Sequence, residues 1–194
     1  MTPTIAAIIW AIGVLVWAAI RMPRRRVAKR TAVVIDKKSN AERIALGLCI
    51  LGLAILPIIY LATDVLDFAN HSYSSWMGWI GAIIMIDFLV LFYICHKEIG
   101  KNWSVTLEVR EDHELIQSGI YHYVRHPMYT SFWLWGLAQA LLLPNWIAGF
   151  AGLAAVAWLY FSRVDKEEEM MREQFGAEYD AYCTRTGRIF PRLL

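Results

Sequence analysis

Five long apolar runs constrain the fold of this chain more than any other feature. They cover residues 5–20, 44–61, 76–95, 128–143 and 146–162. An α-helix needs about 20 mostly apolar residues to cross the ~30 Å hydrocarbon core of a bilayer. With 58% hydrophobic residues, the chain carries more apolar surface than a soluble domain of 194 residues can bury. The sequence therefore predicts an all-α, polytopic integral membrane protein with about five transmembrane helices.

The distribution of charge predicts how these helices are oriented. Residues 21–43 hold nine Lys or Arg against two acidic residues, whereas residues 63–75 hold two Asp and no Lys or Arg. Cytoplasmic loops carry the excess of Lys and Arg. We therefore expect the basic loop and the C-terminus in the cytoplasm and the N-terminus outside. Because the basic residues follow the first apolar run, that run is expected to be a retained helix and not a signal peptide.

We expect residues 1–194 to form a single membrane domain. Residues 1–62 are its N-terminal two-span region, and residues 76–194 carry the functional site. The basic loop is also suited to contact with the head groups of anionic membrane lipids. Nucleic acid is not expected as a partner, because no other motif supports it.

The last two apolar runs predict a tight helical hairpin. Pro144 and Asn145 separate them, and this dipeptide is typical of a turn. The first of the two runs spans only about 24 Å at 1.5 Å per residue, so the hairpin just crosses the bilayer or stops short. Either way, both ends return to the cytoplasmic face. The hairpin thereby brings the polar residues 119–129 close to the charged residues 163–169.

Metal chemistry is not expected at these polar residues. His122 and His126 have the spacing of a zinc-binding H-E-x-x-H helix, but Tyr123 replaces the essential Glu. Pro127 favours the start of a helix here and not its continuation. No Ser or Cys stands convincingly beside a base for nucleophilic catalysis.

Asp87 lies inside the third apolar run. An ionisable group within the bilayer is costly and commonly marks function. The alternative is a carboxylate that hydrogen-bonds to a neighbouring helix, and the sequence leaves both interpretations open.

Arg163 and Glu167 stand one helical turn apart. An Arg can bind a carboxylate and a Glu an ammonium group, so the pair suits a zwitterion. S-adenosylmethionine presents a zwitterion through its methionine moiety, together with a sulfonium that aromatic faces stabilise. The alternative, a simple surface ion pair, contributes about a few tenths of a kcal/mol. No Gly-rich dinucleotide motif follows a strand, which argues against a Rossmann methyltransferase.

An ordered set of motifs occupies the second half of the chain. It comprises Gly119-Ile120-Tyr121, Arg125-His126-Pro127-Met128-Tyr129, Arg163 with Glu167 and Glu168, Phe175-Gly176, and Tyr179 with Tyr182. This set resembles the isoprenylcysteine carboxyl methyltransferase family over roughly residues 100–191, and the phospholipid N-methyltransferases resemble it too. The resemblance implies an all-helical membrane methyltransferase that uses S-adenosylmethionine.

The resemblance also implies roles for the matched residues. It assigns cofactor binding to His113, Leu115, Ile116, Tyr121, His126, Pro127, Tyr129, Arg163 and Glu167. It implies that Arg125 and Glu168 are the catalytic residues, with Glu168 on the substrate side.

The methyl acceptor implied by the resemblance is the carboxylate of a prenylated cysteine or a similar lipid-tailed molecule. A carboxylate has a pKa near ~4 and is ionised at neutral pH, so its methylation needs no general base. One alternative is a phospholipid amine, which must first lose a proton, with Glu168 or Tyr129 as the base. A second is a sterol-reductase-like oxidoreductase with a nicotinamide cofactor. A third is a helical membrane scaffold without enzymatic activity.

Overall fold

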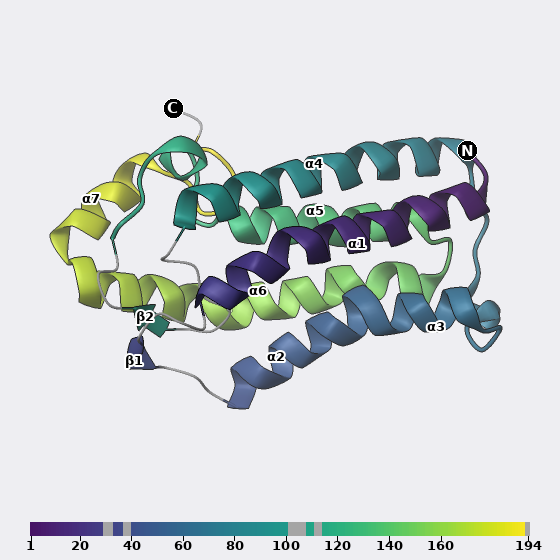
Figure 1. The fold of residues 1–194 in the computed structure, drawn as a ribbon, viewed down its shortest axis with the longest axis horizontal. Coiled ribbons are helices and arrows are strands. Elements are labelled where there is room, and N and C mark those ends of the chain that lie inside the picture. The colour runs from purple at the N-terminus through teal and green to yellow at the C-terminus, as the bar shows by residue number, and fades with distance from the viewer. Residues whose placement is uncertain (29–32, 37–39, 101–107, 111–113, 193–194) are drawn as a thin grey trace.

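The computed structural model describes residues 1–28, 33–36, 40–100, 108–110 and 114–192, and five helical rods lie side by side in this part (Figure 1). The first rod is α1 (Pro3–Ala28). The second combines α2 (Asn40–Ile50), the π-helical segment η1 (Leu51–Ile55) and α3 (Leu56–Ala62). The others are α4 (Ser75–Ile99), α5 (Pro127–Leu142) and α6 (Trp146–Phe175). Each rod coincides with one apolar run, which confirms the helical membrane fold.

Four rods are long and apolar enough to cross a membrane. Within the described residues these are Pro3–Pro23, Asn40–Ala62, Ser75–Ile99 and Trp146–Phe175. The fifth, α5, has 16 residues and spans about 24 Å. Its first turn contains Pro127, whose missing N–H costs nothing there. Asn145 caps α6 by accepting hydrogen bonds from Ile147 and Ala148, and the predicted tight hairpin is confirmed.

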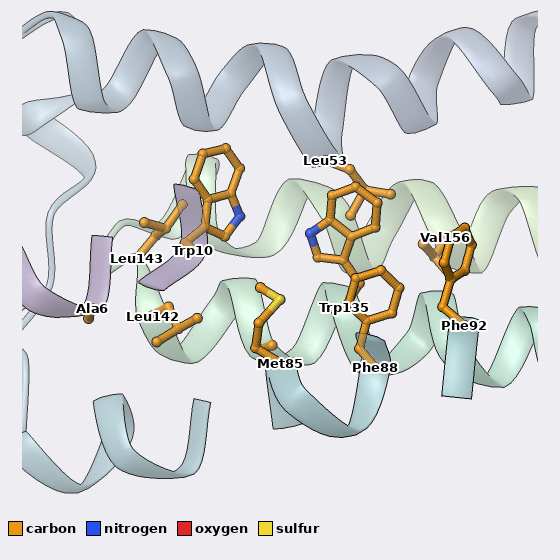
Figure 2. Close-up of a cluster of buried hydrophobic side chains, with 11 residues drawn as sticks. Ala6, Trp10, Leu53, Met85, Phe88, Phe92, Trp135, Leu142, Leu143 and Val156 are labelled. Atoms are coloured by element: carbon orange, nitrogen blue, oxygen red, sulfur yellow. The ribbon is translucent and has the colours of Figure 1, made fainter. Parts of the chain in front are cut away.

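Aromatic side chains fill the space between α1, α4 and α5 (Figure 2). Phe88 stacks on Trp135 with ring centroids 5.0 Å apart, and Trp17 lies 4.8 Å from Trp135. Trp10 and Met85 are also buried in this cluster. Lipid tails are as apolar as these side chains, so close van der Waals contact holds the helices together.

One buried amide joins α5 to three other rods. The Gln139 side chain of α5 donates to the carbonyl oxygens of Gly52 at 2.8 Å and Ala148 at 2.7 Å, and accepts from Trp10 Nε1 at 3.2 Å. A Cβ on Gly52 would lie 2.5 Å from the Ala151 carbonyl oxygen, so glycine allows η1 to approach α6 closely. The π-helical segment η1 ends just before Pro57, which stands in the first turn of α3.

The chain after the hairpin forms two helices. The near-helical spacing of Met170, Met171, Phe175, Tyr179 and Tyr182 predicts one helix over residues 163–183, but α6 ends at Phe175 and α7 (Ala177–Arg185) follows. Gly176 between them has φ +53°, a conformation that residues with a Cβ rarely adopt. This turn folds α7 back toward η4 (Gly119–His122).

A short two-stranded sheet is a further difference from the expectation. β1 (Val33–Asp36) pairs antiparallel with β2 (Glu108–Arg110). The sequence indicates only an extended piece at residues 105–109, and residues 105–107 lie outside the described part. The pairing joins the two long loops that the charge pattern places on the same side of the membrane.

The opposite end of the bundle is closed by the hairpin turn. The Asn145 side chain donates to the Leu66 carbonyl oxygen at 2.7 Å and to Asn70 Oδ1 at 2.9 Å, next to η2 (Asp67–Ala69). The Met1 amino group hydrogen-bonds to the Ser75 hydroxyl at this end, far from α7 (Figure 1). The polar stretches of interest therefore gather at one end of the molecule.

Candidate active site

The two polar stretches at the base of the hairpin are in contact. Arg125 and His126 directly precede α5, and α6 extends far enough to place two carboxylates beside them. His126 Nδ1 lies 3.7 Å from Glu167 Oε1, and His126 Nε2 lies 3.3 Å from Glu168 Oε1. The contact predicted from hairpin geometry is confirmed.

Glu167 forms one half of this cluster. The Tyr129 hydroxyl donates to Glu167 Oε2 at 2.8 Å, and Arg163 Nε lies 3.6 Å from the same oxygen. The side chains of Arg163 and Glu167 are 12% and 28% exposed. A guanidinium, a carboxylate and a phenol thus lie together, partly shielded from solvent.

Glu168 forms the other half and is buried. Its Oε1 accepts from Arg125 Nε at 3.1 Å, and its Oε2 accepts from Arg188 Nη2 at 2.8 Å. Arg172 Nη2 lies 3.8 Å from Oε2. An ion held away from water needs such partners to offset its lost hydration. Both oxygens of Glu168 are therefore engaged by cations.

The segment after α7 holds Arg125 in place. Arg125 Nη1 donates to the backbone carbonyl oxygens of Cys183, at 3.3 Å, and Thr186. The Arg125 backbone N–H donates to Gly187 at 2.8 Å, and that of His126 donates to Arg188 at 2.9 Å. These contacts bring Arg188 to Glu168, a role that the sequence analysis missed because no motif marks Arg188.

The C-terminal tail packs against the domain only in part. Ile189 contacts the apolar cluster around Tyr129 and Tyr160, and its carbonyl oxygen accepts from Thr130 Oγ1 at 2.8 Å. Phe190 is 72% exposed. Ile189 thus packs on the domain, whereas Phe190 points away.

Tyr121 lies buried in η4 beneath α7. Its carbonyl oxygen accepts from the Tyr182 hydroxyl at 2.5 Å. Gly119 has φ +58°, and a Cβ there would clash with the carboxylate of Glu98, which accepts from the Ile120 N–H at 2.8 Å. Burial raises the pKa of Tyr121 well above 10 and that of Tyr182 to about 12, so both phenols stay neutral.

The His126 ring lies between the two carboxylates. Burial lowers the pKa of its imidazole, but the two neighbouring carboxylates, Glu167 and Glu168, outweigh this effect and raise the pKa above 6.5. Two acceptors on one ring favour the doubly protonated form, which donates from both nitrogens.

Arg163 has a second carboxylate partner, which the sequence analysis missed. Glu42 of α2 places Oε1 3.2 Å from Arg163 Nη1, and its side chain is 4% exposed. A shallow hollow between α2 and α6 opens beside this pair, lined by Ala41, Glu42, Ala45, Leu159, Ser162, Arg163 and Lys166. The one sequence feature that could have pointed to Glu42 is its position as an acidic residue inside a strongly basic stretch.

The other predicted residues come before Arg125 and His126 in the chain. Leu115 and Ile116 are half-buried in the segment before η4, and His113 lies outside the described residues. His122 is exposed whereas His126 is buried, so the two do not converge. No group of His, Cys, Asp and Glu in the described part is placed to hold a metal ion.

The donors around Tyr129 fit a polar, zwitterionic cofactor. Trp133 packs beside Tyr160 in the apolar cluster around Tyr129. Its buried Nε1 finds no hydrogen-bond acceptor among the described residues. A buried donor without an acceptor is costly, and a ligand carbonyl, hydroxyl or carboxylate would satisfy it.

Comparison with known proteins agrees with this geometry. Residues 79–173 match the sequence model of the isoprenylcysteine carboxyl methyltransferase family. A protein-S-isoprenylcysteine O-methyltransferase from Dictyostelium discoideum is 33% identical over 114 residues, which are 57% of this chain and 47% of that protein. The corresponding protein B from Arabidopsis thaliana is 28% identical over 134 residues, 68% of each chain.

A solved structure of a eukaryotic intramembrane Ras methyltransferase of this type also matches. It has a TM-score of 0.55 and 26% identity, and the match covers 81% of this chain and 54% of the other. The chain thus spans about half the length of these two relatives, the Dictyostelium protein and the solved structure. The resemblance to the family that the sequence predicts is confirmed.

Proposed function

We propose that this protein is an S-adenosylmethionine-dependent methyltransferase of the membrane that methylates the carboxylate of a prenylated cysteine or a similar lipid-tailed molecule. The matched relatives carry the name of this activity. The observation that carries the proposal is the cluster in which Arg163, Glu167 and Tyr129 lie together at the base of the hairpin.

In this proposal Arg163 binds the carboxylate of the cofactor, and Glu167 accepts a hydrogen bond from its ammonium group. Tyr129 and His126 fix the orientation of Glu167. The cofactor supplies an electrophilic methyl group on its sulfonium. Tyr121, Pro127, Leu115 and Ile116 form the wall of the site.

Arg125 and Glu168 act on the acceptor side. Glu168 holds Arg125 and Arg188 in place, and these guanidinium groups neutralise an incoming carboxylate. Alignment and partial removal of water then favour attack by that carboxylate, which is already ionised. Since the oxygens of Glu168 are occupied by cations, this carboxylate is a poor proton acceptor. This argues against a phospholipid amine, which must be deprotonated first.

The orientation in the membrane follows from the proposal. The hairpin base faces the cytoplasm, where the cofactor is found, and the N-terminus lies outside. Membrane lipid surrounds the helices, and a lipid-tailed acceptor reaches the site from the hydrocarbon side. No metal takes part.

The test supplies the purified full-length protein with methyl-labelled S-adenosylmethionine and either a prenylated cysteine derivative or phosphatidylethanolamine. We expect label only on the prenylated cysteine, as a methyl ester that alkali releases as methanol. Alkali-stable label on the phospholipid would establish the amine activity instead. Absence of S-adenosylhomocysteine binding by calorimetry would contradict both and favour a reductase.

Variants of the proposed cofactor-binding residues provide a second test. Arg163→Met and Glu167→Gln should each weaken S-adenosylhomocysteine binding by about tenfold or more, or ~1.4 kcal/mol. Glu169→Gln is the matched control, because it removes a carboxylate from an exposed position of the same helix. Unchanged affinity in both cluster variants would refute the proposed binding residues.

A further inference from the structure

Asp87 lies halfway along α4, a helix long and apolar enough to span a membrane. It is twelve positions from each end of the helix, Ser75 and Ile99, and at 1.5 Å per residue that is about 18 Å. An aspartate side chain is far too short to reach either membrane interface from this depth. Its carboxylate must therefore be accommodated within the hydrocarbon region.

The carboxylate of Asp87 faces away from the bundle. The opposite side of α4 packs on α1 and α5 through the buried side chains Met85, Phe88 and Phe92. Asp87 itself is exposed, and the described residues give it neither a hydrogen bond nor an ion pair. The interpretation of Asp87 as a partner of a neighbouring helix of this chain is therefore wrong.

An apolar stripe surrounds Asp87 along the outer face of α4. Its exposed members lie one, three or four residues apart over most of the helix: Trp76, Trp79, Ile80, Ile83, Ile86, Val90 and Tyr93. This spacing is what a second helix needs to pack along its whole length. Figure 1 shows α4 at the edge of the bundle.

We propose that this outer face of α4 is a docking surface for a transmembrane helix of another protein that carries a Lys or Arg near its midpoint. Charged residues inside a membrane are costly unless they pair with one another. A basic residue in the partner would neutralise Asp87, while its apolar neighbours would pack on Ile83, Ile86 and Val90. A second copy of this chain fits less well, because it would place Asp87 against another Asp87.

The test uses a synthetic leucine–alanine transmembrane helix with one lysine at its midpoint. Full-length protein with a donor fluorophore and the helix with an acceptor are placed in phosphatidylcholine vesicles. We expect energy transfer to show at least about tenfold tighter association than for the same helix with leucine at the midpoint. Asp87→Leu and the isosteric Asp87→Asn should each abolish that preference.

Moving the carboxylate to another helix tests whether binding requires the outer face of α4 or only a carboxylate halfway along a helix. In Asp87→Leu/Leu15→Asp the carboxylate moves to an exposed position halfway along α1. We expect this double variant to bind the lysine helix no better than Asp87→Leu does. Equal binding with and without Asp87, or full binding by the transplant, would overturn the docking surface. Energy transfer between two labelled copies without peptide, lost in Asp87→Leu, would overturn the choice of partner.

Discussion

At the residue scale, two adjacent carboxylates of α6 have different surroundings. Successive residues of a helix point about 100° apart, so Glu167 faces Tyr129 and Arg163 while Glu168 faces Arg125 and Arg188. Glu167 is 28% exposed and Glu168 only 1%. We therefore expect Glu168 to contribute mainly to stability and Glu167 mainly to binding.

Glu168→Gln tests this division. The substitution removes the carboxylate that Arg125 contacts, whereas Arg188 keeps Asp165 at 2.8 Å. Removing one member of a buried ion pair costs about 3–5 kcal/mol. Glu167→Gln should cost less than ~1.5 kcal/mol, since the amide still accepts from Tyr129. Denaturant unfolding of the detergent-solubilised protein measures both. Equal losses would show that the two carboxylates share one role.

The pH dependence of stability should reveal His126. Its pKa is raised in the folded protein, so the folded state binds the proton more tightly than the unfolded state does. The stabilisation is complete below pH ~6.5, the unfolded value, and is lost as the pH rises through the raised folded value. Melting temperatures across this range should fall for the native protein and stay flatter for His126→Gln. If the melting temperature of His126→Gln falls equally steeply with pH, the pH dependence belongs to another group.

At the element scale, the rods are held together by close approach and one shared amide. η1 lies against α6 at Gly52, and the Gln139 side chain satisfies the carbonyl oxygens of Gly52 and Ala148. A π-helical turn leaves such carbonyl groups available for partners on other helices. The irregular turn, the glycine and the amide therefore form one packing unit.

Gln139→Leu should weaken this unit. The variant keeps a side chain of similar size but removes the hydrogen bonds to three rods. We expect the free energy of unfolding to fall by about 1–3 kcal/mol. Gln174→Leu, on an exposed position of α6, makes the same chemical change and should have little effect. Unfolding midpoints in detergent compare the two. Equal midpoints for both variants would mean that losing the hydrogen bonds of the Gln139 side chain does not reduce stability.

At the scale of the whole molecule, the N-terminal region takes part in the candidate site. The family match covers residues 79–173, yet Glu42 of α2 pairs with Arg163 inside that region. The β1–β2 pairing gives a second connection between the two parts. The site is therefore completed by a segment that the family match does not include.

A double-mutant cycle on Glu42→Gln and Arg163→Met should measure this connection. Contacting charged residues typically couple by about 0.5–3 kcal/mol in stability. We expect the double variant to lose less stability than the two single losses add up to, because removing Arg163 together with Glu42 leaves no unpaired carboxylate at position 42. The loss of the contact between Arg163 and Glu167 is common to the double variant and to Arg163→Met and cancels in the cycle. Additive losses would show that the two groups act independently and that α2 contributes only bulk to the site.

The sequence by itself determined the helices and the hairpin, because both follow from local patterns. Apolar length predicts a span, Pro144 and Asn145 mark a turn, and the spacing of Arg163 and Glu167 places them on one helix face. Only the tertiary structure decided the long-range partners, Glu42 with Arg163 and Arg188 with Glu168, and the outward-facing position of Asp87. These depend on how far each helix is rotated and shifted against its neighbours. Packing sets that rotation and shift, and the period of a single helix does not encode them.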